Sequence, residues 1–276
     1  MSNYMDNFDF STIYKNSMKP LIHYITNYVT SNDVANMTLA FGGSPIMAEA
    51  IEEVDEITSI SNCLVINIGT ITSNKLKSIK RAIKVANNNN VPIILDPVGV
   101  AATSYRKEIV FDILNNYKID VIKGNASEIK ALLGLETNSK GVDSEEMDVE
   151  DIEAIGYKVA KTYNIIVAIT GKIDTVCSDK YVAKINDGSK MLTSITGTGC
   201  MISPLIAVAL AKTGDAFASS IYGISAMNEA AVLVDDNLKE KESVGTFKVK
   251  LLDSIYNMKD KNFIDRKKVV VNEISK

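Results

Sequence analysis

The sequence has few of the residues from which metal clusters and disulfide frameworks are built. Its 276 residues include one histidine, three cysteines and no tryptophan. The lone His23 excludes a multi-histidine zinc site, and three unclustered cysteines, Cys63, Cys177 and Cys200, exclude a Cys₄ site. The odd number of cysteines argues against a disulfide framework and fits a reducing, cytoplasmic compartment.

The sequence also lacks a strong excess of one charge and a long hydrophobic run. It has 34 acidic and 30 basic residues, a formal net charge of −4, which offers no electrostatic footprint for a nucleic acid. Residues 1–10 lack the basic and apolar regions of a signal peptide. The longest apolar run, residues 200–211, is too short to span a bilayer. We therefore expect a cytoplasmic protein whose partners are neither nucleic acids nor membranes.

Short apolar segments rich in Ile and Val alternate with longer amphipathic segments. This alternation predicts an α/β fold, with a doubly wound, mostly parallel central sheet and helices on both faces. The expected strands are residues 63–68, 92–96, 119–122 and 165–170, and the expected helices are residues 74–87, 105–116, 126–133 and 149–163.

The pattern changes after Thr170. Shorter segments separated by turn residues predict an antiparallel meander over residues 175–178, 180–185 and 190–194. Residues from 200 to about 258 are expected to be helical. No repeat or Pro/Gly/Ser-rich linker interrupts the sequence, so we expect a single domain over residues 1–276.

Ligands of doubly wound sheets bind at the carboxyl ends of the strands, where the first candidate residue, Asp96, is expected. A carboxylate at that position could hold a hard cation through oxygen. Asp96-Pro97 also fits an ordinary turn before the next helix, which is the preferred interpretation when the residue is taken alone.

The second candidate segment, Lys123-Gly-Asn-Ala-Ser-Glu128, follows another expected strand. Asn125 and Glu128 share a helix face and could orient a metal-bound water, while Lys123 could reach a phosphate. A helix cap explains the same residues, with Asn125 at the N-cap and Glu128 three positions on. Both interpretations stay open, and they are compatible with each other.

The third candidate segment is Thr196-Gly-Thr-Gly-Cys200, which leads into an apolar helix. Two glycines allow backbone amides to approach an anion, so Gly199 is a candidate contact for a nucleotide phosphate. At the start of a helix, the Cys200 thiol is expected to ionise more easily than a free thiol. The alternative is a glycine turn before a core helix with a buried cysteine.

Together the three segments suit phosphoryl transfer. This reaction needs a metal, an anion cradle and a group that orients the attacking hydroxyl, and little covalent help from the protein. The residues alone therefore favour an ATP-dependent kinase of a small molecule.

With these motifs the sequence resembles the hydroxyethylthiazole kinases of thiamine biosynthesis and salvage, in the ribokinase-like superfamily. The resemblance extends from about residue 20 to 256. The most distinctive segments are His23-Tyr-Ile-Thr-Asn27 and Thr196-Gly-Thr-Gly-Cys200, since related sugar and pyrimidine kinases usually have Asp where Cys200 stands. The other matching segments are residues 32–36, 44–48, 67–70, 96–99 and 124–128.

The resemblance implies a ribokinase-like fold and phosphorylation of 4-methyl-5-(2-hydroxyethyl)thiazole by ATP and Mg²⁺. It also implies a homotrimer with the substrate site between subunits. Cys200 would be the base or orienting group for the alcohol. The further implied contacts are Asn27, Met47, Gly69 and Gly197 for the thiazole, Lys123 and Thr170 for ATP, and Asp96 and Glu128 for Mg²⁺.

Three alternatives remain at this point. Cys200 and residues 23–27 argue against two of them, a pyrimidine or sugar kinase and an ADP-dependent hydrate dehydratase. A catalytically inactive binding protein is argued against by the presence of both Asp96 and Glu128. Lys123 stands where the family more often has Arg, so the charge is kept but the bidentate fork toward a phosphate is lost.

Overall fold

The computed structural model describes residues 8–135, 148–259, 261–264 and 267–274, together with Tyr4. In this part of the chain, one sheet has the strand order β2-β1-β3-β4-β5-β6-β7-β8-β9. The strands are β1 (Leu21–Ile25), β2 (Ser44–Met47), β3 (Cys63–Asn67), β4 (Ile93–Asp96), β5 (Val121–Asn125), β6 (Ile166–Thr170), β7 (Asp174–Cys177), β8 (Tyr181–Ile185) and β9 (Val269–Glu273).

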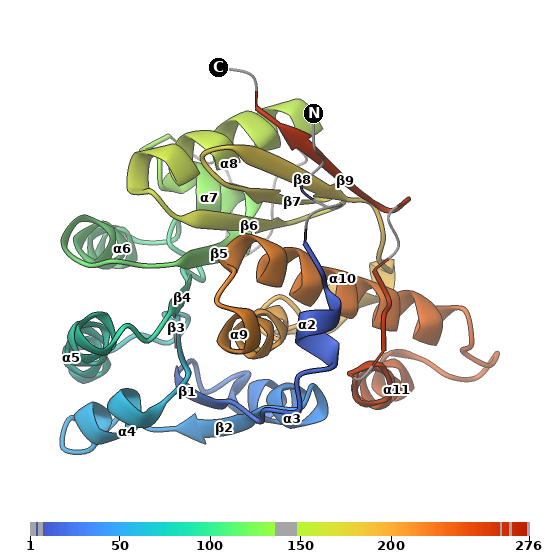
Figure 1. The fold of residues 1–276 in the computed structure, drawn as a ribbon, viewed down its shortest axis with the longest axis horizontal. Coiled ribbons are helices and arrows are strands. Elements are labelled where there is room, and N and C mark those ends of the chain that lie inside the picture. The colour runs from blue at the N-terminus through green and yellow to red at the C-terminus, as the bar shows by residue number, and fades with distance from the viewer. Residues whose placement is uncertain (1–3, 5–7, 136–147, 260, 265–266, 275–276) are drawn as a thin grey trace.

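The pairings from β2 to β6 are parallel and those from β6 to β9 are antiparallel. The helices are α2 (Ser11–Tyr14), α3 (Ser31–Ala40), α4 (Val54–Ile60), α5 (Ser73–Asn89), α6 (Ser104–Asn116), α7 (Ala126–Ala131), α8 (Val149–Tyr163), α9 (Ile202–Thr213), α10 (Ala216–Asp235) and α11 (Val244–Met258). Helices α4, α5 and α6 lie on one side of the sheet, and α9, α10 and α11 lie on the other (Figure 1). The predicted doubly wound, mostly parallel α/β architecture is confirmed.

The apolar segments in the sequence form strands that are covered on both faces. Alternate residues of β3 enter different cores: Cys63 and Val65 belong to the core that includes α9 and α10, whereas Leu64 and Ile66 belong to the core that includes α5 and α6. A strand between two layers of helices needs no polar face, which explains why these segments are apolar throughout.

The four expected strands correspond to β3, β4, β5 and β6, and the four expected helices to α5, α6, α7 and α8. The strand expected at residues 119–122 is shifted, because β5 extends from Val121 to Asn125. Lys123 therefore lies within a strand and not after it. The strands β1 and β2, at one end of the sheet, were not predicted.

One segment of the predicted meander is wrong. Residues 190–194 form the 3₁₀ helix η1 (Lys190–Ser194), whose start is capped by the Ser189 side chain accepting from the Met191 amide. The edge of β8 that this segment was expected to occupy pairs with β9 instead. The third antiparallel strand therefore comes from more than seventy residues further along the chain.

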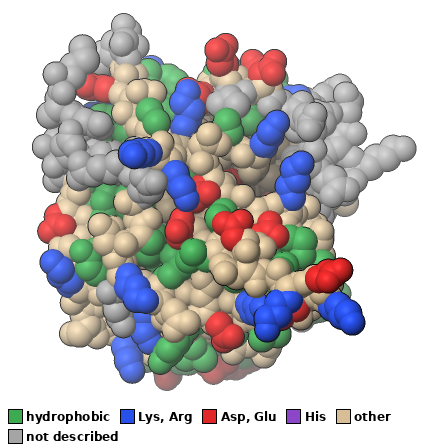
Figure 2. All heavy atoms as spheres, turned by 90° about the vertical axis from the view of Figure 1, so that its right-hand side faces the viewer, with side chains coloured by type: hydrophobic (Ala, Val, Ile, Leu, Met, Phe, Trp, Pro, Cys, Tyr) green, Lys and Arg blue, Asp and Glu red, His purple; other side chains and the backbone are tan. Residues whose placement is uncertain are grey.

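Within the described part of the chain, one helix, α10, is long and apolar enough to cross a membrane. However, 83% of its most apolar window is buried inside the protein, as in a core helix. On the face of the molecule at the right-hand side of Figure 1, acidic and basic side chains are interspersed with hydrophobic ones (Figure 2).

Candidate active site

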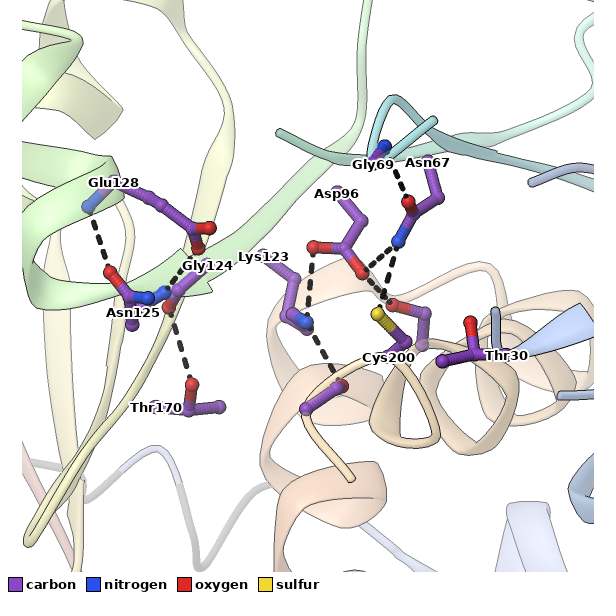
Figure 3. A network of polar contacts seen from close by, with 12 residues as sticks. Thr30, Asn67, Gly69, Asp96, Lys123, Gly124, Asn125, Glu128, Thr170 and Cys200 are labelled. Atoms are coloured by element: carbon purple, nitrogen blue, oxygen red, sulfur yellow. Dashed lines mark hydrogen bonds and ion pairs between the residues drawn. The ribbon is translucent and has the colours of Figure 1, made fainter. Parts of the chain in front are cut away.

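The carboxyl ends of β3, β4 and β5 meet the glycine turn that precedes α9. Asn67 and Asp96 are the last residues of β3 and β4 and are partners in the parallel register. Lys123 points toward Asp96 from β5, and Cys200 approaches from the turn (Figure 3). Segments far apart in the sequence thus place an amide, a carboxylate, an ammonium and a thiol together.

Asp96 and Lys123 form a buried ion pair. Lys123 Nζ lies 3.1 Å from Asp96 Oδ1 and donates to the carbonyl oxygen of Gly199 at 2.9 Å. Burial favours the neutral amine, but the attraction of Asp96, Cys200 and Glu128 outweighs it and raises the pKa of Lys123 above its usual value. Lys123 is therefore a cation that joins β4 to the glycine turn.

The Cys200 thiol differs from its expected state. Its sulfur accepts from Asn67 Nδ2 at 3.3 Å and from Asn27 Nδ2 at 3.7 Å. Burial and the nearby Asp96 carboxylate raise its pKa to about 11, despite the opposing effects of Lys123 and of the bond from Asn67. The expectation of an easily ionised thiol is wrong, because α9 begins only at Ile202 and Cys200 lies in the turn before it, beside a carboxylate.

Asn125 and Glu128 form the capping box that the sequence allowed. Asn125 Oδ1 accepts from the Glu128 amide, and Glu128 Oε2 accepts from the Asn125 amide, each at 2.9 Å. The other oxygen, Oε1, accepts from the Gly99 amide at 2.9 Å, in the turn after Asp96. Burial and the charge of Asp96 raise the pKa of Glu128 to about 7. The cap therefore holds a second carboxylate close enough to Asp96 to interact with it.

Asn27 and Gly69 lie on the other side of the same network. Asn27 is 4% exposed, and its oxygen accepts from the Thr30 amide at 2.9 Å. The Gly69 amide donates to Asn67 Oδ1 at 2.9 Å. Gly197 has φ +85°, and an added Cβ there would collide with the Thr30 side chain, so the turn packs closely against the loop after β1.

Two predicted site residues lie outside this cluster. Met47 ends the edge strand β2 and is 39% exposed. Thr170 ends β6, where its hydroxyl donates to the Gly124 carbonyl at 3.5 Å, on the Glu128 side of the site (Figure 3). The structure thus brings Cys200, Asp96 and Lys123 together with Asn27, while Met47 and Thr170 end other strands of the sheet.

Sequence reasoning missed Asn67 as a residue of the site. Asn67 is 2% exposed and contacts both Asp96 and Cys200. A signal was present, since a polar residue closes a wholly apolar strand at the carboxyl edge of the sheet, just as Asp96 does. His23 is not part of the site. Its two ring nitrogens form hydrogen bonds with Thr58 Oγ1 and the Ala48 carbonyl in the core.

Comparison with known proteins identifies the family. A sequence profile of the Hydroxyethylthiazole kinase family matches residues 14–261. The hydroxyethylthiazole kinase of Alkaliphilus metalliredigens is 42% identical over 247 residues, 90% of each chain. That of Clostridioides difficile is 43% identical over 241 residues, 87% of this chain and 90% of its own. The chain belongs to the hydroxyethylthiazole kinase family.

Solved structures agree with this assignment to the hydroxyethylthiazole kinase family. The hydroxyethylthiazole kinase protein of Pyrococcus horikoshii OT3 has a TM-score of 0.81 and 35% identity, covering 93% of this chain and 94% of that one. The pyridoxal kinase of Staphylococcus aureus has a TM-score of 0.65 at 15% identity, covering 94% of this chain and 100% of its own. A ribokinase-like protein of Enterococcus faecalis has a TM-score of 0.58 at 12% identity, covering 88% and 89%. The two latter likenesses show the shared ribokinase-like fold.

Proposed function

We propose that the protein transfers the γ-phosphoryl group of ATP to the hydroxyl of 4-methyl-5-(2-hydroxyethyl)thiazole, as a kinase of thiamine biosynthesis or salvage. The observation that carries the proposal is the convergence of Cys200, Asp96 and Lys123 at one sheet edge in a chain of this family. The alcohol oxygen forms the new bond to the γ-phosphorus, the bond from that phosphorus to the β-phosphate oxygen breaks, ADP leaves, and the hydroxyl proton of the alcohol is released to solvent.

Each group of the site has a place in this reaction. Cys200 lies where it can orient the alcohol, and its raised pKa favours orientation by a neutral thiol over proton abstraction at neutral pH. Such a role suits a loose transition state that needs little deprotonation of the attacking hydroxyl. Gly197 and Gly199 lie in a turn whose backbone amides can face phosphate oxygens. On the thiazole side we place Asn27, Gly69, Gly197 and Met47, and on the nucleotide side Lys123, Thr170 and Gly199.

Asp96 and Glu128 fit the binding of a magnesium ion. In the described part of the chain no group of three or more His, Cys, Asp or Glu side chains could hold a metal. Mg²⁺ is commonly held by one or two carboxylates together with substrate phosphates, so two carboxylates are sufficient. Burial and the repulsion from Asp96 raise the pKa of Glu128, and a cation between the two carboxylates would relieve the repulsion. When bound, the ion would neutralise charge on the phosphates.

The substrate site is proposed to be completed by a neighbouring subunit in a homotrimer. Met47, a proposed thiazole contact, is exposed on edge strand β2. Further large apolar side chains are exposed in the segments that surround β1 and β2, namely Tyr28, Val29, Leu39, Ile51 and Ile60. Sedimentation should give a mass of three times 30.1 kDa; a monomer would contradict this part of the proposal.

The single continuous sheet supports one domain over residues 1–276. The three free cysteines support a cytoplasmic location.

Substrate identity is tested by coupling ADP release to an optical assay, with the thiazole alcohol, a hydroxymethylpyrimidine, pyridoxal and a sugar offered separately. We expect the highest kcat/KM with the thiazole alcohol. No turnover of it, together with turnover of another alcohol, would overturn the substrate assignment.

A further inference from the structure

Asn67 occupies the centre of the polar network at the carboxyl edge of the sheet. It is the last residue of β3 and faces Asp96 of β4 in the parallel register. Its side chain lies between Gly69 on one side and the Asp96 carboxylate and Cys200 thiol on the other (Figure 3). The residue is 2% exposed, so its side chain is shielded from solvent.

The carboxamide of Asn67 uses its full hydrogen-bonding capacity. Nδ2 donates to Asp96 Oδ2 at 2.7 Å and to Cys200 Sγ at 3.3 Å. Oδ1 accepts from Asn27 Nδ2 and from the Gly69 amide, both at 2.9 Å. An Asn side chain has two N–H donors and one oxygen with two lone pairs, so no capacity remains unused.

The partners also fix which way the amide points. The Gly69 amide can only donate, so the atom facing it must be the oxygen. The Asp96 carboxylate can only accept when ionised, so the atom facing it must be the nitrogen. The Asn67 side chain thus has a donor edge toward Asp96 and Cys200 and an acceptor edge toward Asn27 and Gly69.

We propose that Asn67 is a positioning residue for phosphoryl transfer. Its donor edge fixes the Asp96 carboxylate and the Cys200 sulfur relative to each other, and its acceptor edge fixes the loops that carry Asn27 and Gly69. The inference rests on the proposed function, because it assigns Asn67 a part in the same reaction. Phosphoryl transfer depends on placement of the reacting groups, so loss of this alignment lowers the rate.

The two edges can be separated by substitution. Asn67→Asp keeps the size and the acceptor oxygen for Asn27 and Gly69, but removes both N–H donors. Asn67→Ala removes both edges. Asn89→Asp is the matched control, because Asn89 is an exposed residue at the distant end of α5.

The expected results differ between kcat and KM. Asn67→Asp lowers kcat by about 10- to 100-fold, as loss of a preorganised donor does, and leaves KM for the thiazole alcohol within about twofold of wild type. Asn67→Ala lowers kcat similarly and also raises KM, by about fivefold or more. Asn89→Asp changes neither constant. All rates are normalised to folded protein, so a merely structural role would leave kcat unchanged.

A wild-type kcat in Asn67→Asp would overturn the inference, as would equal effects of both variants on KM. If the introduced charge prevents folding of Asn67→Asp, the kcat of Asn67→Ala decides, and a loss below about threefold overturns the inference. A wild-type enzyme inactive on the thiazole alcohol is instead a failure of the proposed function.

A second readout tests Asn67 whichever alcohol is phosphorylated. Cys63 and Cys177 are fully buried, whereas Cys200 is partly exposed, so iodoacetamide reports on Cys200 in the folded protein. Asn67→Asp replaces a donor to sulfur with a carboxylate, and should slow alkylation by about threefold or more at about pH 8. An unchanged alkylation rate contradicts the proposed hold on the sulfur.

Discussion

Lys123 Nζ lies 3.1 Å from Asp96 Oδ1, and both side chains are almost completely withdrawn from solvent. The same ammonium donates to the Gly199 carbonyl, so it ties the glycine turn to the carboxylate at the end of β4. A lysine is sufficient for this junction because the junction needs one point charge rather than a planar fork.

Removing this ion pair should cost much more stability than removing one at the surface. Lys123→Met keeps a long side chain but leaves the buried Asp96 without its ion-pair partner, and should lower the free energy of unfolding by about 3–5 kcal/mol. The matched control is Lys80→Met, which breaks the exposed pair with Asp112 and should cost less than about 1 kcal/mol. Urea unfolding measures both, and equal losses would show that burial of the Lys123 pair has no energetic consequence.

Cys200 should contribute to kcat more than to nucleotide affinity. Because the pKa of about 11 leaves the thiol neutral at physiological pH, Cys200→Ala should lower kcat by about 10- to 100-fold, at or below the lower end of general-base effects. Cys200→Ser retains an orienting hydroxyl and should lose less. Steady-state kinetics with ATP varied should show KM for ATP nearly unchanged. A wild-type rate in Cys200→Ala would remove the thiol from the mechanism.

The sequence was sufficient to predict the central fold because its signals are local. The strands β3, β4 and β6 are apolar up to their last residue, and the helices α5 and α8 have clear amphipathic spacing. The sequence pattern predicts a strand where Lys190–Ser194 form a 3₁₀ helix. The segment that pairs with the edge of β8 is β9, which lies near the C-terminus. No local pattern reports which distant segment takes a sheet edge.

In the candidate site too, local signals in the sequence could be recognised, whereas effects of distant segments could not. Asp96, Lys123 and Cys200 stand in motifs that sequence reasoning could recognise, and the structure brings them together. The raised pKa of the Cys200 thiol could not be predicted, because it depends on burial and on Asp96, which is 104 positions away in the sequence. Asn67 was missed as a contact for the same reason, since its partners come from three different segments.

A buried carboxyl away from the site predicts a pH-dependent stability. Asp174 accepts from Asn228 Nδ2 at 2.6 Å and from the Gly171 amide at 2.9 Å, yet burial raises its pKa from 3.8 to about 6. Between these two values the folded protein binds more protons than the unfolded chain, so stability falls as the pH rises. The total loss attributable to Asp174 is about 3 kcal/mol.

Asp174→Asn should remove this part of the pH dependence. An amide at residue 174 can still accept from Gly171, and Asn228 can turn its own amide to accept in return. Glu128, whose pKa is about 7, adds a fall of its own, so the difference between wild type and variant isolates Asp174. Urea unfolding from about pH 4 to about pH 7 measures that difference. Asp179→Asn, in an exposed turn, is the control, and parallel curves for wild type and Asp174→Asn would contradict the assignment.

The two glycines of the turn before α9 should tolerate alanine very differently. Gly197 has φ +85°, and a Cβ there would collide with the Thr30 side chain. Gly197→Ala should therefore cost about 1–3 kcal/mol through strain and overpacking and displace the turn from Asn27, which raises KM for the thiazole alcohol. Gly199 has no such φ, and an added Cβ would meet nothing nearer than Lys123 Nζ at 3.9 Å. Gly199→Ala should fold like wild type, and a Gly197→Ala variant as stable as Gly199→Ala would show that the turn is not held against Thr30.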